Sequence, residues 1–294
     1  MADVFILGIA VTDFVFSVVD LPSEAAKYRA DTAEIVGGGC AANAAVAVAR
    51  LGGRAALAAP VGDDPLADII VGDLAAAGVM TKHMRRIPGG RSSFSSVFVD
   101  AAGERQIVNF RGSGLISDIG WLDDVAPADA VLVDTRRPEE AAAALDLARD
   151  WGVPGILDGE PPTDPALLQK ASHVALSRAG LRALDDRDDP AAALAAVARD
   201  LSGWVCVTDG ENGVYHTDAG GITHVPGFPV AVVDTLGAGD VWHGAFALAL
   251  AEGRTEAAAV VFANAAAALK CMKFGGRAGC PDRARVENFL KETA

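Results

Sequence analysis

Short apolar runs rich in β-branched residues alternate along the chain with longer runs rich in alanine and leucine. The short runs have the length of strands and the long runs have the length of helices. The runs that predict strands are Val4–Ala10, Ala55–Val61, Ala130–Asp134, Gly155–Asp158, His173–Leu176 and Trp204–Thr208. The runs that predict helices are Cys40–Leu51, Pro65–Ala77, Pro138–Trp151, Pro190–Leu201, Gly239–Glu252 and Thr255–Lys270. This alternation predicts an α/β fold with a doubly wound, mostly parallel sheet and helices on both faces.

Two segments depart from the alternation. Thr12–Val36 lacks helical periodicity, and Ser93–Phe110 alternates like an antiparallel hairpin with Asp100-Ala101-Ala102-Gly103 as its turn. We interpret both as parts of a small β-sheet inserted into the main domain, at about residues 12–36 and 93–110. A sheet placed over the ligand edge of the main sheet would act as a lid that excludes water from a reaction.

Charge and cysteine content exclude several classes of protein. The 294 residues carry a net charge of -14, which argues against a nucleic-acid binder and against adsorption to anionic membranes. The four cysteines form no CxxC pair, so we expect reduced thiols in the cytoplasm. The apolar run Val4–Ala10 has no basic residues before it and predicts a strand, not a signal peptide.

The strongest chemical signal is the stretch Asp234-Thr235-Leu236-Gly237-Ala238-Gly239-Asp240, which precedes a helical run. Its small residues let backbone N–H groups gather at a helix N-terminus, and that arrangement binds anions. Asp240 would then accept a proton from a hydroxyl while these N–H groups hold a phosphoryl group. The residues alone equally allow a glycine-rich turn in which Asp240 is only an N-cap.

A second glycine-rich stretch is Gly37-Gly38-Gly39-Cys40-Ala41-Ala42-Asn43, again at the start of a helix. Its glycines allow a ligand to approach the backbone closely, and Asn43 offers a donor and an acceptor to a polyol. A tight loop with a capping Asn43 is the alternative. No Gly-Lys-Ser/Thr follows, so the stretch is not a P-loop, and Gly8–Asp13 lacks the glycines of a dinucleotide-binding turn.

Over essentially its full length the chain resembles the ribokinase family, the PfkB sugar kinases. The matching motifs are Gly38-Gly39 with Asn43, Ala49-Arg50-Leu51-Gly52, Val61-Gly62-Asp63-Asp64, Thr208-Asp209-Gly210-Glu211-Asn212-Gly213, Asp234–Asp240 and Phe262-Ala263-Asn264-Ala265-Ala266. Several motifs in the family's order are more specific than any one of them. The resemblance implies that residues 1–294 form a single ribokinase-like kinase domain that transfers the γ-phosphoryl group of ATP to a sugar hydroxyl.

The resemblance also implies a role for individual residues. Asp240 is the catalytic base, and Gly237, Ala238 and Gly239 form the anion hole. The residues that it implies for sugar binding are Asp13, Gly38, Gly39 and Asn43. Those that it implies for ATP binding are Thr208, Gly210, Gly213 and Asn264. Without the resemblance, these positions would be interpreted as turn, cap and ordinary helix residues.

Metal ions are the point at which the chain departs from the family pattern. Mg²⁺ is needed to neutralise charge on ATP, but Ser177-Arg178-Ala179-Gly180 replaces the NxxE motif that helps organise it in many family members. We therefore expect phosphates and water to hold most of the Mg²⁺ shell, with Asp158 or Glu160 contributing only through water. The resemblance also implies a monovalent cation such as K⁺ beside Asp234 and the loop Gly275–Gly279.

Several polar residues are placed to bind the far end of the sugar. Lys27 lies in the lid segment, Asn109 closes the lid hairpin, and Arg136 and Arg137 follow a strand at the edge where open α/β sheets bind ligands. Each of these residues alone would be interpreted as a solvated side chain. Together they would bracket the far end of an anionic sugar. With the tail Ala268–Cys271, this set is most similar to the 6-deoxy-6-sulfofructose kinases and next to the ketohexokinases.

Both subfamilies imply phosphorylation at C1 of a ketose. The alternatives are a fructokinase or ribokinase-like kinase of a neutral sugar and, in another class, a non-catalytic sugar- or nucleotide-binding member of the family. The intact Asp240 and anion hole argue against the non-catalytic alternative. Lids of this kind often pair in the family, so we expect a homodimer.

Overall fold

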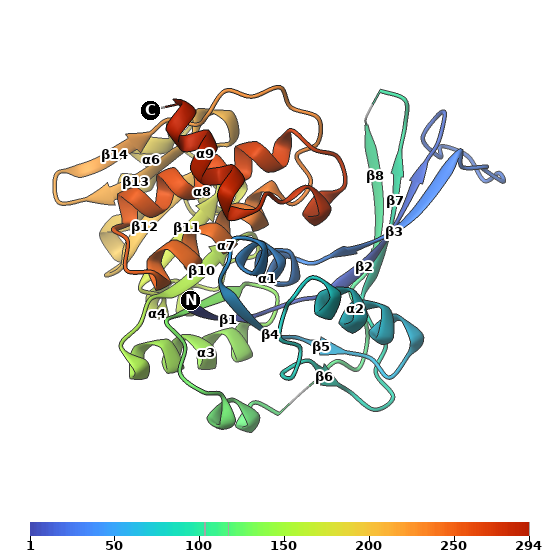
Figure 1. Cartoon of the computed structure of the whole chain (residues 1–294), viewed down its shortest axis with the longest axis horizontal. Helices are drawn as coiled ribbons and strands as arrows, with labels where there is room; N and C mark the ends of the chain where they lie inside the picture. Colours follow the sequence, from blue (N-terminus) through green and yellow to red (C-terminus); the bar gives the residue numbers. More distant parts are fainter. Residues whose placement is uncertain (103, 117, 294) are drawn as a thin grey trace.

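The computed structural model describes residues 1–102, 104–116 and 118–293, and its main body is built on an eight-stranded sheet (Figure 1). The strand order is β14-β13-β12-β11-β10-β9-β1-β4. The strands are β1 Asp3–Leu7, β4 Arg54–Ala58, β9 Ala130–Asp134, β10 Gly155–Gly159, β11 His173–Ser177, β12 Trp204–Thr208, β13 Val214–Asp218 and β14 Gly221–Val225. From β12 to β4 every pairing is parallel, whereas β13 and β14 are antiparallel. The predicted, mostly parallel sheet is therefore confirmed.

Helices cover both faces of this sheet, as alternate residues of the inner strand β1 require. Val4 and Ile6 of β1 are buried in one core with α1, α7 and α8, while Phe5 and Leu7 are buried in a second core with α3, α5 and α6. A parallel strand that is apolar at successive positions needs a cover on each side. The helices are α1 Cys40–Arg50, α2 Pro65–Ala76, α3 Pro138–Trp151, α4 Pro165–Lys170, α5 Arg178–Leu184, α6 Pro190–Val197, α7 Ala238–Ala251, α8 Glu256–Cys271 and α9 Arg283–Thr293.

The helices α1 and α7 pack closely because the residues between them are small. A Cβ on Gly244 of α7 would lie 2.5 Å from the backbone oxygen of Ala44 in α1. This close packing brings the N-terminal turns of both helices together. Because Asn43 and Asp240 lie in those two turns, the packing decides how the catalytic candidates meet.

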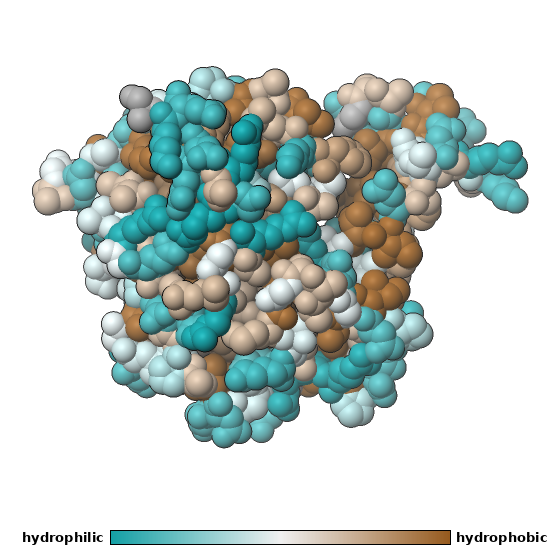
Figure 2. Space-filling model, in the orientation of Figure 1, coloured by the Kyte–Doolittle hydropathy of each residue, from teal (hydrophilic) through white to brown (hydrophobic). Residues whose placement is uncertain are grey.

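A separate four-stranded sheet stands beside the main body (Figure 1), at the segments predicted to form a lid, and is called the lid below. Its order is β3-β2-β7-β8, with β2 Val11–Ser17, β3 Thr32–Gly38, β7 Phe94–Val99 and β8 Arg105–Phe110. The hairpin predicted from the alternation at 93–110 is thus confirmed as β7 and β8. Of its predicted turn, Gly103 lies outside the described residues. Figure 2 shows apolar residues gathered along this sheet on the face in view.

Some predicted boundaries were wrong for local reasons. The predicted strand Ala55–Val61 ends at Ala58, because Pro60 has no N–H with which to continue the ladder, and Pro60–Val61 pairs as β5 with β6 Arg85–Arg86. The predicted helix Pro190–Leu201 ends at Val197 and continues as a short 3₁₀ turn. No helix among the described residues has the length and apolar character needed to span a bilayer.

Candidate active site

Two buried carboxylates lie at the carboxyl ends of neighbouring strands, the edge where open α/β sheets bind ligands. Asp134 of β9 and Asp158 of β10 are partners in the parallel register. Asp134 accepts hydrogen bonds from the N–H groups of Ile9 and Arg136, at 2.8 and 2.9 Å. Asp158 Oδ1 is buried and has no hydrogen-bond partner among the described residues. Burial raises the pKa of both carboxyls.

Asp240 stands beside this pair, in the first turn of α7. The turn begins at Gly237, whose φ of 74° is in the left-handed region that glycine adopts without strain. Asn43 Nδ2 donates to Asp240 Oδ2 at 2.6 Å, across the contact between α1 and α7. Burial, together with the charge of Asp158, raises the pKa of Asp240 to about 7, and the Asn43 hydrogen bond opposes the rise. A carboxylate with this pKa is suited to take a proton near neutral pH.

The turn around Asp240 presents unpaired backbone donors at the N-terminus of α7. The N–H of Ala238 is already used by the oxygen of Thr235, at 3.1 Å. The N–H groups of Gly239 and Asp240 donate to no backbone oxygen in the described part of the chain. A Cβ on Gly239 would meet nothing within 4 Å, so open space lies beside these donors. Free N–H groups and the helix dipole together make this turn suited to an anion.

Each glycine of the Gly37–Gly39 stretch has its own structural reason. A side chain at Gly38 would overlap the Asp13 carboxylate, and one at Gly37 would overlap the guanidinium of Arg277. Gly39 has a φ of 95° and a backbone oxygen, that of Ile9, beside its Cα. The first two glycines therefore admit side chains of the protein itself. Asp13 packs against Gly38 and is not among the residues that line the cavities described below, and burial raises its pKa against a hydrogen bond with Ser95.

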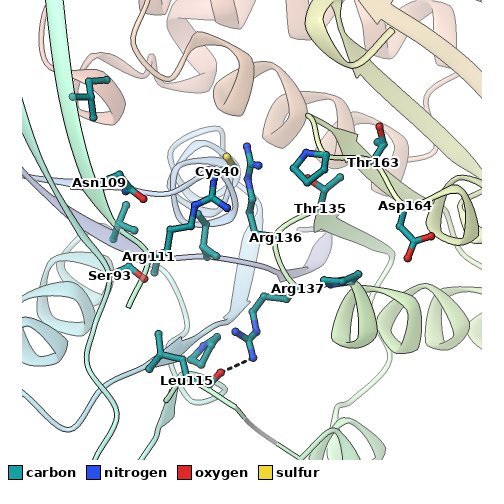
Figure 3. A pocket seen from close by; sticks show the side chains of 17 residues that line it. Cys40, Ser93, Asn109, Arg111, Leu115, Thr135, Arg136, Arg137, Thr163 and Asp164 are labelled. Carbon is teal, nitrogen blue, oxygen red and sulfur yellow. Dashed lines mark hydrogen bonds between the residues drawn. The ribbon is translucent and has the colours of Figure 1, made fainter. Parts of the chain in front are cut away.

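One cavity, of about 660 Å³, opens between the lid and the carboxyl edge of the sheet (Figure 3). Among the residues that line it are Cys40, Asn109, Arg111, Arg136 and Arg137. The side chains of Arg111 and Arg136 reach toward one another in this view. The cavity also leads to the carboxylates, because Cys40 Sγ and one oxygen each of Asp158 and Asp240 lie within 4.8 Å of one another.

The three arginines of this cavity differ in how much of their charge is already matched. Arg137 donates to both oxygens of Glu140, at 2.6 Å each, and to the oxygen of Leu115 at 2.7 Å. Arg136 donates to the oxygen of Pro161 at 2.6 Å, which fixes the side chain without neutralising it. Arg111 is exposed and makes no hydrogen bond or ion pair with the other described residues. Two guanidinium groups without an ion pair among the described residues therefore face the cavity, and the charge of Arg136 also acts on the buried carboxylates Asp134 and Asp158.

A second cavity, of about 760 Å³, lies on the other side of the α7 N-terminus. It is lined by all four residues expected to bind ATP, Thr208, Gly210, Gly213 and Asn264, and also by Ala238 and Gly239 of the turn. The amide of Asn264 is fully engaged: its oxygen accepts from Trp242 Nε1 at 2.8 Å and its nitrogen donates to the oxygen of Pro226 at 3.2 Å. Asn264 thus shapes the wall of the cavity through its neighbours.

Two residues that the sequence suggested for binding lie in other settings. Lys27 is exposed in the loop between β2 and β3 and is not among the residues that line either cavity. Asp234 is buried and already accepts from Arg105 and Lys270. Ser177 caps α5 by accepting from the N–H of Gly180 at 2.9 Å, so the segment in place of NxxE offers no carboxylate.

Sequence reasoning missed Arg111, Asp134 and Lys270 as parts of the site. Asp134 carried a signal, since it ends a fully apolar strand at the ligand edge of the sheet. Lys270 also carried a signal in the sequence, since it is a charged residue near the end of the mostly apolar helix α8. Arg111 follows the lid hairpin and carried no signal beyond its charge.

Comparisons with known proteins extend over both the main sheet and the lid. The family model for pfkB family carbohydrate kinase matches residues 1–283. A ribokinase of Bacillus subtilis (strain 168) is 31% identical over 299 residues, covering 99% of this chain and 100% of that protein. An ATP-dependent ribose-1-phosphate kinase of Halopiger xanaduensis is 33% identical over 269 residues, covering 87% of each chain. The structure of Arabidopsis thaliana ribokinase complexed with ribose and ATP is 26% identical, with a TM-score of 0.88 and 99% of each chain covered.

Proposed function

The chain belongs to the pfkB family of carbohydrate kinases and is an ATP-dependent kinase of the ribokinase type, and from this premise we propose how its residues perform the transfer. The sugar occupies the cavity beside Arg111 and ATP occupies the cavity beside Thr208. Asp240 lies between them and takes the proton of the attacking hydroxyl. The observation that carries this proposal is that the α7 turn lines the cavity beside Thr208, while its Asp240 lies within 4.8 Å of Cys40, which lines the cavity beside Arg111.

The transfer needs little from the protein beyond position and matching charge. The free N–H groups of Gly239 and Asp240 stabilise negative charge that grows on the transferred phosphoryl group. Asn43 orients the Asp240 carboxylate through its nitrogen, and its buried oxygen, which lacks a partner among the described residues, accepts from a sugar hydroxyl. Asp13 and the backbone at Gly38 and Gly39 bind further hydroxyls. These roles give each polar group near Asp240 a defined partner.

Mg²⁺ supplies charge neutralisation on the phosphates of ATP when it is bound. The residues present fit a Mg²⁺ coordination shell made mostly of phosphate and water oxygens. Asp158 would contact this shell only through a water molecule. Its Oδ1 is buried, makes no hydrogen bond with the other described residues and lies 3.6 Å from His243 Nε2, and a nearby hydrated cation would relieve the cost of its burial. Cys40 lies close to Asp158 and Asp240, but its sulfur is a soft ligand that Mg²⁺ does not favour. Burial also raises the pKa of the Cys40 thiol well above its ordinary value.

We infer that the acceptor sugar carries an anion at the end remote from the transferred phosphoryl group. The support is the pair of guanidinium groups, Arg111 and Arg136, that make no ion pair among the described residues and line a cavity of an otherwise acidic protein. Arginine binds oxyanions through a planar fork of donors. The compound that the sequence resemblance indicates is 6-deoxy-6-sulfofructose, phosphorylated at C1, and the relative named for ribose-1-phosphate acts on another anionic sugar. Asn109 adds a neutral donor on the lid side.

A neutral sugar, ribose or fructose, is the second candidate. It is favoured by the 31% identity to a ribokinase along the whole chain and by Asp13 and Asn43, whose polar groups suit hydroxyls. A non-catalytic family member is disfavoured by the free donors around Asp240 and by the raised pKa of this carboxyl. A panel of sugars in an assay of ADP release distinguishes the three candidates.

The anionic acceptor is tested with Arg111→Met and Arg136→Met, assayed on 6-deoxy-6-sulfofructose and on fructose. Each variant should lose about tenfold or more in kcat/KM on the sulfonated sugar, the value of one lost charge-assisted hydrogen bond, and much less on fructose. Lys27→Met is the matched control and should change neither value, because Lys27 lines neither cavity. Equal losses on both sugars, or a wild-type preference for fructose or ribose, would move the assignment to the neutral sugar.

A further inference from the structure

A fully buried lysine contacts the segment that leads into the anion hole. Lys270, near the end of α8, is 0% exposed, and its Nζ lies 2.7 Å from the backbone oxygen of Asp234 and 3.2 Å from Asp234 Oδ2. An ammonium group is almost never fully buried unless it is paired. Both of its identified partners belong to Asp234, so this residue is the reason for the buried charge.

Asp234 is saturated by donors from several parts of the chain. Besides Lys270 they are the N–H groups of Leu236, Gly275 and Gly276, at 2.9, 3.1 and 3.2 Å, and Arg105 Nη2 at 2.7 Å. A carboxylate offers about four acceptor positions, so five donors leave none over. Burial alone would raise the pKa of Asp234, but the donors of Leu236, Gly276 and Lys270 lower it to about 2.

These residues do not fit the monovalent cation that the family resemblance implies at Asp234 and the loop Gly275–Gly279. The loop turns two N–H groups toward Asp234, and a cation needs oxygen ligands there instead. The ammonium of Lys270 already contacts the carboxylate and the backbone oxygen that would otherwise bind the ion. A second positive charge at Asp234 would meet Lys270 and Arg105, which already occupy its carboxylate.

The C-terminus of α8 also fixes the backbone of the segment that precedes the anion hole. The oxygen of Cys271 accepts from the N–H groups of Val233 and Asp234, at 2.8 and 3.1 Å. Gly237, which begins the anion-hole turn, follows only three residues after Asp234. We propose that the Lys270 ammonium is a built-in cation that positions this turn, so that the kinase needs no K⁺. The proposal rests on the ATP-dependent activity of the family and is independent of the acceptor sugar.

The first test uses the wild-type protein in chloride salts of K⁺, Na⁺ or tetramethylammonium at one ionic strength. We expect kcat with the accepted sugar and Kd for ATP to agree among the three salts within about twofold, and Tm to agree within error. A twofold change in rate corresponds to only about 0.4 kcal/mol. Stimulation of kcat by K⁺ of about tenfold or more, or K⁺-specific tightening of ATP binding, would overturn the proposal. The Kd and Tm measurements need no sugar, so they decide the question even if the acceptor is misassigned.

The second test compares two truncations that differ in the space they leave. Lys270→Ala opens room for a small cation, so it should lose about tenfold or more in kcat and regain most of it with K⁺ or methylammonium. Lys270→Met fills the space and should stay low in every salt. Lys273→Met, three residues on and exposed, is the control and should resemble the wild type. Full activity of Lys270→Ala in tetramethylammonium would contradict the positioning role, and if a variant fails to fold, the wild-type salt comparison decides alone.

Discussion

At the scale of single residues, the chemistry depends on carboxylates that the fold holds partly out of water. Asp134 and Asp158 are buried side by side, and their proximity adds to burial in raising the pKa of Asp158. Asp240 feels the charge of Asp158 and receives one hydrogen bond from Asn43. Burial raises the pKa of Asp240 most, the charge of Asp158 raises it further and the Asn43 hydrogen bond lowers it, and the pKa of about 7 is the balance of these effects.

This balance predicts a pH profile that two substitutions move in opposite directions. The base must be unprotonated, so kcat/KM for the sugar should fall about tenfold per pH unit below about pH 7. Asp158→Asn removes a negative neighbour and should shift the midpoint to lower pH. Asn43→Ala removes a hydrogen bond to the charged form and should shift it to higher pH. Asp150→Asn, at an exposed position on α3, is the control, and identical midpoints in all four proteins would exclude Asp240 as the titrating group.

Several residues of the site were predictable from the sequence because a motif fixes their local geometry. The stretch Gly237–Asp240 could be assigned because it occurs together with the other motifs of the family in their usual order, whereas its residues alone equally allowed a glycine-rich turn. The roles of Arg111 and Lys270 could not be predicted in this way, because they depend on which groups lie near these side chains in the folded protein. An arginine without a partner or a lysine at 0% exposure is a property of the packed chain, and a pattern along the sequence does not contain it.

At the scale of elements, the lid is joined to the anion-hole segment by one ion pair. Arg105 begins β8, and its Nη2 lies 2.7 Å from Oδ1 of Asp234, whose side chain is only 2% exposed. The arginine itself is 32% exposed, so solvent weakens the pair to about 1 kcal/mol or less. Such a contact is weak enough to open and close, as a lid requires. We propose that the segments 12–36 and 93–110 close over the bound sugar.

The lid proposal predicts that sugar slows hydrogen exchange in these two segments. Arg105→Met should reduce this protection and raise KM for the sugar by about two- to fivefold, since the pair contributes about 1 kcal/mol or less. Tm should change little because the arginine is partly exposed. Arg29→Met, in the exposed β2–β3 loop, is the control and should behave as wild type. Unchanged exchange in both segments with saturating sugar would remove the lid from the account.

The predictable elements were those whose apolar runs match one secondary structure. The strands β9 and β12 and the helix α3 have the predicted bounds. Each strand is a run of four apolar residues that ends in one polar residue, and the helix is bounded by Pro138 and Gly152. The hairpin of β13 and β14 and the helix α9 were not predicted. Only Val286 of α9 is buried, and β14 has no buried residue, so polar positions hide their periodicity.

At the scale of the whole molecule, the outer face of the lid is a candidate contact between two copies of the chain. Ile35 and Val108 are 58% and 63% exposed, and the register places both in one row with Phe14 and Ser96. This row lies on the face opposite Asn109. Exposed apolar residues grouped on one sheet favour association with a partner, and the charge of -14 on each copy makes an apolar contact preferable. We propose a homodimer formed through this face.

The dimer predicts a mass of twice the chain by light scattering during gel filtration. Val108→Glu places a charge at the β8 end of this row and should give the monomer mass. Ile116→Glu changes a residue that is 85% exposed away from the row and should leave the dimer intact. A monomeric wild-type protein, or a dimer that survives Val108→Glu, would show that this face is not the interface.

The central claim, that Asp240 takes the sugar proton between two cavities, is tested most directly by Asp240→Asn. The amide keeps the shape of the side chain but cannot accept the proton. We predict that kcat falls by about 10²–10⁴-fold, while Kd for ATP, measured by calorimetry on the same preparation, stays within about threefold of the wild-type value. A variant that keeps more than about a tenth of the wild-type kcat would show that Asp240 is not the base.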